Sequence, residues 1–176
     1  MVELLNKQQK ISFSGSRASH QNGAAERAIK TVVTMERTML MYTALRCPEE
    51  NFSTDLWPMA LDYAVCVYNQ IPDMQSGLSD IEIWSRSRFE TVLETLSNCH
   101  VWGCLTYFLK PKLQKPGVKI PKWGPRSQRG VNMGFIKMHS SQVGLVLNLL
   151  TGSISPQYHI VFYDMFSTVV GGPAQY

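Results

Sequence analysis

The chain of 176 residues has no hydrophobic run that approaches the roughly 20 residues needed to cross a bilayer. Its first residues, MVELLNKQQK, also lack the basic and then apolar order of a secretory signal. We therefore expect a soluble, intracellular protein. Disorder is not expected either, because a hydrophobic content of 44% suffices for the core of one compact domain or of two small ones.

The cysteines form no CxxC pair and follow no secretory signal, so a disulfide framework is not expected. Cys47, Cys66, Cys99 and Cys104 are better interpreted as reduced thiols that pack as small hydrophobic side chains. Cys99 and His100 with Cys104 resemble half of a metal site. A tetrahedral zinc site needs a second pair of ligands at suitable spacing, and the sequence offers none.

Acidic residues are missing from one long interval. All 13 Asp and Glu lie at or before Glu94 or at Asp164, so residues 95–163 hold eight Lys and Arg and a formal charge of +8. Such asymmetry predicts a polyanionic partner for this part of the chain. Seven of the eight cations fall between Lys110 and Arg129, in a proline-rich stretch with one tryptophan. A solvated surface loop has the same composition, so both interpretations stay open.

Hydrophobic periodicity predicts mainly helices in the first half of the chain. A short helix at 2–9 and a brief strand at 11–14 precede an amphipathic helix over 24–45, which is entered through Asn22-Gly23. The helix expected from about 54 to 71 is apolar on nearly every side and should be largely buried, with Trp57 in the core. A short helix should start at Asp80, with Trp84 as its anchor.

The second half reads as β structure. Four short apolar runs, at 99–109, 129–137, 142–150 and 157–164, are separated by Gly, Pro and Ser, which is typical of a small antiparallel barrel or meander. The basic loop between the first two runs is too rich in proline to be helical. The fold class predicted from the residues is therefore α+β.

Four segments of the sequence resemble one known family. "HQNGAAERAIKTVVTMERTML", "LWPMALDYAVCVYNQIP", "VWGC" and "QYHIVFYD" are similar to the latter half of the integrase of copia-type long-terminal-repeat retrotransposons. The resemblance implies a truncated RNase H-like core over 1–97, a small Src-homology-3-like barrel over 98–168 and a tail over 169–176. The parent protein would join element DNA ends to target DNA, act in nucleus and cytoplasm, and form homo-oligomers.

Glu26 is the residue that this resemblance singles out. It corresponds to the third acidic ligand of a catalytic site in which two Mg²⁺ or Mn²⁺ ions promote phosphodiester transfer. From spacing alone, Glu26 is first a residue that complements the helix dipole. DNA contacts are expected from a wider set that shares positive charge, hydrogen-bonding capacity or an aromatic ring: Gln21, Asn22, Arg27, Lys30, Lys115, Lys119, Lys122 and Trp123.

The sequence departs from the family pattern at the other two catalytic positions. The family has two aspartates upstream, whereas this chain has no Asp before Asp55, and Glu3 is the only other acid ahead of Glu26. We therefore expect a fragment that binds no metal tightly and is inactive by itself. It should leave an apolar face of its long helix exposed. The alternatives are a non-catalytic module that binds nucleic acid or protein, and an inactive relic of a transposable element.

Overall fold

The computed structural model of the chain describes residues 15, 22–47, 53–85, 96, 99–114, 117, 119–135 and 143–166. The chain divides into two compact units, residues 1–31 and 32–176, and each is described by itself. The short helix expected at 2–9, the strand expected at 11–14 and the tail at 169–176 lie outside the described residues. Within the described ranges, no helix is long and apolar enough to cross a bilayer.

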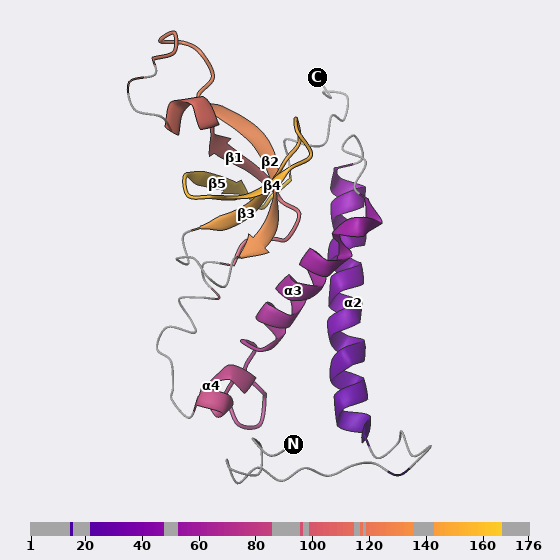
Figure 1. Ribbon diagram of the computed structural model, residues 1–176. Coiled ribbons are helices and arrows are strands. Elements are labelled where there is room, and N and C mark those ends of the chain that lie inside the picture. Colours follow the sequence, from indigo (N-terminus) through magenta and orange to yellow (C-terminus); the bar gives the residue numbers. More distant parts are fainter. Residues whose placement is uncertain are drawn as a thin grey trace, which may run out of the picture. The chain divides into compact units, whose positions relative to one another are not determined.

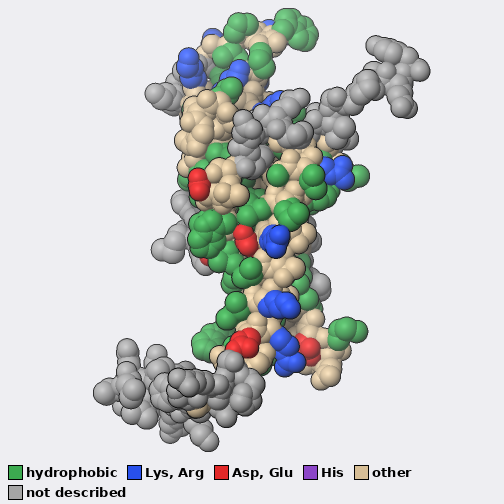
Figure 2. All heavy atoms as spheres, turned by 90° about the vertical axis from the view of Figure 1, so that its right-hand side faces the viewer, with side chains coloured by type: hydrophobic (Ala, Val, Ile, Leu, Met, Phe, Trp, Pro, Cys, Tyr) green, Lys and Arg blue, Asp and Glu red, His purple; other side chains and the backbone are tan. Residues whose placement is uncertain are grey.

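The long helix predicted over 24–45 is present as α2, Gly23–Arg46. Its second half contacts the core through Met39 and Leu40, and Thr43 is fully buried. Several of its large hydrophobic side chains are nevertheless exposed: Ile29, Val33, Met41, Tyr42 and Leu45. Figure 2 shows hydrophobic and cationic side chains exposed side by side along this helix.

Helix α3, Trp57–Tyr68, follows a single 3₁₀ turn, η3, Thr54–Leu56. Pro58 lies in its first turn, as expected, because a missing N–H costs nothing there. The prediction that nearly every side is buried is wrong for Trp57, which is 52% exposed. Only one face of the helix, with Ala60, Tyr63 and Ala64, is buried. Trp57 is the first residue of α3 and lies at its N-terminal end.

Helix α4, Asp80–Ser85, begins where the sequence predicted it. The backbone N–H of Ser79 donates to the Glu82 carboxylate at 2.8 Å, and the Glu82 N–H donates back to the Ser79 hydroxyl at 3.4 Å. The prediction that Trp84 anchors this helix is wrong, since its side chain is 83% exposed. Reciprocal capping, and not aromatic packing, fixes the start of α4.

Five antiparallel strands form one sheet in the order β4-β3-β2-β1-β5 (Figure 1). Their bounds are β1 Leu105–Leu109, β2 Ser127–Phe135, β3 Gly144–Asn148, β4 Ile154–Gln157 and β5 Ile160–Tyr163. Helices and an antiparallel sheet confirm the α+β class. The sequence patterns missed β4, which contains Pro156. Proline is tolerated there because β4 is an edge strand.

The two edge strands follow each other directly in the chain, with only Tyr158 and His159 between them. The sheet must therefore curl to bring its edges toward one another. A side chain at Gly144 of β3 would meet Ile160 and Phe162 of β5, which shows how far it curls. The expected barrel is not closed, because β4 and β5 remain edges and are not paired with each other.

The core lies where α3 meets β1 and β2. Its buried residues are Ala60, Tyr63, Trp102, Leu105, Val131 and Met133. An irregularity in β2 between Asn132 and Gly134 shifts the register against β3. Gly134 adopts φ +107°, and a side chain there would clash with the Tyr63 ring. The bulge thus lets α3 approach the sheet closely.

Candidate nucleic-acid interface

The start of α2 brings together three of the candidate site residues. Glu26, Arg27 and Lys30 line a shallow cavity of about 470 Å³ with Gly23. Glu26 is exposed in the first helical turn, where the helix dipole favours a negative charge. Asn22 directly precedes the helix and is exposed, whereas Gln21 lies outside the described residues.

The residues described around Glu26 do not fit a two-metal site. Two adjacent divalent cations need several oxygen ligands, and Glu26 supplies one carboxylate. Over the described ranges, no group of three or more His, Cys, Asp or Glu is placed to hold a metal ion. We therefore derive no catalytic step at Glu26.

The basic loop between β1 and β2, residues 110–126, is the second cluster of candidate residues. The N–H of Lys110 donates to the Arg126 carbonyl at 3.0 Å and closes the base of the loop. The loop was predicted to hold no helix, but it begins with one 3₁₀ turn, η4, Pro111–Gln114. Lys119 and Lys122 are exposed, and Lys115 lies outside the described residues.

Trp123 is the most exposed tryptophan of the chain, at 88%. The Lys122 ammonium lies 5.3 Å from the centre of its ring, within reach of a cation–π interaction. This arrangement leaves most of a large aromatic side chain in solvent beside fixed positive charge. An exposed aromatic ring and exposed positive charge therefore lie on one loop.

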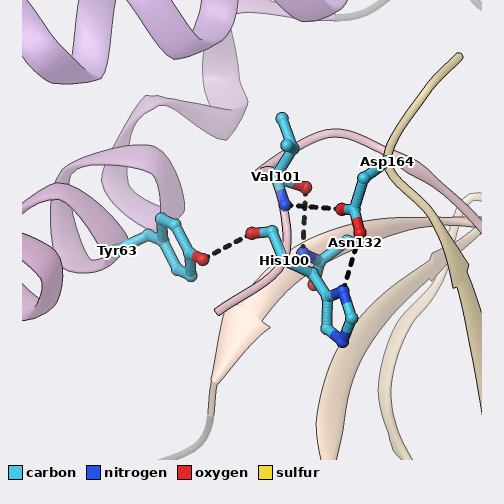
Figure 3. Close-up of polar contacts among 5 residues, drawn as sticks. All are labelled: Tyr63, His100, Val101, Asn132 and Asp164. Carbon is cyan, nitrogen blue, oxygen red and sulfur yellow. Dashed lines mark hydrogen bonds and ion pairs between the residues drawn. The ribbon is translucent and has the colours of Figure 1, made fainter. Parts of the chain in front are cut away.

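A polar cluster that the sequence patterns did not predict joins the end of β5 to the segment before β1 (Figure 3). The Asp164 carboxylate accepts the Val101 N–H at 2.7 Å, and its other oxygen lies 2.9 Å from Nδ1 of His100. The Tyr63 hydroxyl donates to the His100 carbonyl at 2.5 Å. Asp164 is the one carboxylate after Glu94, and that isolation was the available signal.

The His100 ring also stacks on Phe162, with the ring centres 3.8 Å apart. Burial alone would raise the pKa of the Asp164 carboxyl, but the hydrogen bonds from His100 and Val101 hold that pKa below its usual value. We interpret this cluster as a structural clasp, because both carboxylate oxygens are used to hold chain segments together.

Replacing Asp164 with Asn should cost about 1 kcal/mol of folding stability at neutral pH, since the half-exposed carboxylate makes two charge-assisted hydrogen bonds. The folded-state pKa is lowered, so this stabilisation is complete above about pH 5 and is lost as the pH falls through the range below about 4. Urea unfolding at several pH values measures it. The exposed Asp80→Asn is the control, and equal pH profiles for both variants would refute the clasp.

None of the four cysteines, all of which the structure describes, forms a disulfide. Cys47 and Cys104 are buried, in agreement with their expected role as core side chains, whereas Cys66 and Cys99 are only half-buried. Burial, and then the nearby Asp164 charge, raise the pKa of the Cys104 thiol. His100 is engaged by Asp164 through Nδ1, and over the described residues no group of three or more His, Cys, Asp or Glu is placed to hold a metal ion.

Comparison with models of known protein families, with the curated proteins and with solved structures found no match to this chain.

Proposed function

We propose that residues 99–166 bind nucleic acid without sequence preference, and that the chain derives from a copia-type integrase. The first part rests on the loop 110–126, which carries the exposed Lys119, Lys122 and Trp123, with the Lys122 ammonium 5.3 Å from the centre of the Trp123 ring. No carboxylate lies in the surrounding interval 95–163. A phosphate backbone meets cations there without repulsion from neighbouring acids.

The integrase ancestry is supported by the sequence resemblance, and the strand order is compatible with it. The sheet has five antiparallel strands, and its two edge strands, β4 and β5, follow each other in the chain, which agrees with an open Src-homology-3-like barrel. The long helix α2 agrees with a helix of an RNase H-like core. In the parent, such a core would join element DNA ends to target DNA with Mg²⁺ or Mn²⁺. For this chain the proposal is limited to weak, nonspecific binding.

The native chain should bind two unrelated DNA duplexes with equal affinity at low salt, because phosphate contacts carry no sequence information. Fluorescence anisotropy of labelled duplexes measures both affinities. Binding should weaken steeply as salt is raised, since each neutralised phosphate releases counterions. Failure to bind either duplex at low salt, or a strong preference for one of them, would contradict the proposal.

A further inference from the structure

A groove runs across the pairing of β1 with β5 and has no role in the function proposed so far. Its volume is about 400 Å³, and it is lined by Tyr107, Phe108, Leu109, Arg126, Ser127, His159, Ile160 and Val161. Tyr107 and Val161 are direct neighbours in the strand register. Val161 is 66% exposed, so this part of the sheet is open to solvent.

The chemistry of the groove suits a planar aromatic group attached to an anion. Most of the lining is apolar, the Tyr107 ring is partly accessible, and Arg126 and His159 contribute polar nitrogens. No Asp or Glu is present in residues 95–163 to repel an anion. A nucleobase and its phosphate have both features. The base must be unpaired, since a base stacked within a duplex offers no free face.

A second groove adjoins the first and shares Ser127 with it. It has a volume of about 380 Å³, and its lining includes Lys110, Gln128 and Arg129. The side-chain nitrogen of Gln128 is buried and has no hydrogen-bond partner in the described structure. Two cations, Lys110 and Arg129, thus line a groove that shares Ser127 with the first, and the next nucleotide of a strand would meet them there.

Each groove shares one lining residue with the basic loop. Arg126 ends that loop and lines the first groove, and Lys110 begins the loop and lines the second. A cation at each end of the loop therefore borders one of the two grooves. A flexible strand can follow this path, whereas a straight duplex engages only its outermost cations.

We propose that the β1–β5 groove binds an unpaired base and makes the chain prefer single-stranded over double-stranded nucleic acid. This inference rests on the proposed nucleic-acid binding and names its substrate class. Tyr107 provides the stacking surface, Arg126 neutralises the adjoining phosphate, and the second groove accepts the next nucleotide.

The test compares oligothymidylate with a duplex of equal length in fluorescence anisotropy, using the native chain, Tyr107→Leu and Tyr107→Phe. Base stacking on an aromatic side chain is worth a factor of roughly 10 in affinity. Tyr107→Leu should therefore weaken single-strand binding about 10-fold and duplex binding less than 2-fold. Tyr107→Phe keeps the ring and should retain the single-strand affinity. Thermal unfolding of each variant confirms that the fold is unchanged.

Trp84→Ala is the matched control, since it removes an exposed aromatic ring from α4, far from the sheet in sequence, and should change neither affinity. Equal affinity of the native chain for both nucleic acids overturns the inference but leaves the proposed function intact. An unchanged single-strand affinity in a folded Tyr107→Leu overturns it too. Absence of binding to either nucleic acid overturns both.

Discussion

Gly103→Ala is expected to destabilise the chain by about 4 kcal/mol and to lower its melting temperature by roughly 10 °C. Gly103 adopts φ +79°, a conformation that costs an L-residue about 1–2 kcal/mol. A methyl group there would lie 1.8 Å from the hydroxyl oxygen of Thr43, which is fully buried at the end of α2. The Thr43 side chain is held in place, because it is fully buried and its hydroxyl donates to the Trp102 carbonyl.

The matched control for this prediction is Gly152→Ala. Gly152 also has a positive φ, +68°, but a side chain there would meet no atom within 4 Å. Gly152→Ala should therefore lower the free energy of unfolding only by the cost of placing alanine at a positive φ, about 1 kcal/mol. Urea unfolding of both variants separates the clash from the strain. Similar losses for the two variants would mean that α2 does not pack on the Trp102–Gly103 turn as described.

Reversing Lys119 and Lys122 to Glu together should weaken duplex DNA binding by roughly 60-fold at about 0.1 M salt. The figure follows from the counterions released by two phosphate contacts, each of which contributes a slope of about −0.9 in log affinity against log salt. Both side chains are exposed on the loop, so the substitutions should leave the fold intact. Anisotropy titrations of native and variant chains give the ratio directly.

Arg37→Glu with Arg46→Glu is the control for this pair, since it changes the net charge equally on exposed positions of α2. It should reduce affinity only through the weaker overall field, by less than about 5-fold. If the two double variants lost affinity equally, the loop would have no special role, and the net charge of the chain would account for the binding.

Helix bounds could be predicted from the sequence, because periodicity and capping depend on residues that lie close together in the chain. The bounds of α2 follow from its periodicity, and the start of α4 follows from the Ser79 and Glu82 spacing. The exposure of Trp57 and Trp84 could not be predicted in this way. An apolar sequence shows that a helix can be buried, whereas the number of layers around it depends on packing across the whole chain.

The candidate sites show the same limit. Charge and composition located the loop with Lys119, Lys122 and Trp123, since a solvated basic segment is visible in sequence. The clasp of His100 and Asp164 joins residues 64 positions apart, and the β1–β5 groove depends on strand order. Neither has a local signature. The position of Asp164 as the one Asp or Glu after Glu94 was the hint that the sequence held.

The salt dependence of duplex binding, measured for the native chain and for the Lys119→Glu and Lys122→Glu double variant, tests the central claim most directly. If these two lysines contact phosphates, the slope of log affinity against log salt should become shallower by about 1.8 in the variant, from two contacts of about 0.9 each. An identical slope in both proteins would remove the loop from the binding surface and contradict the proposed function of this region.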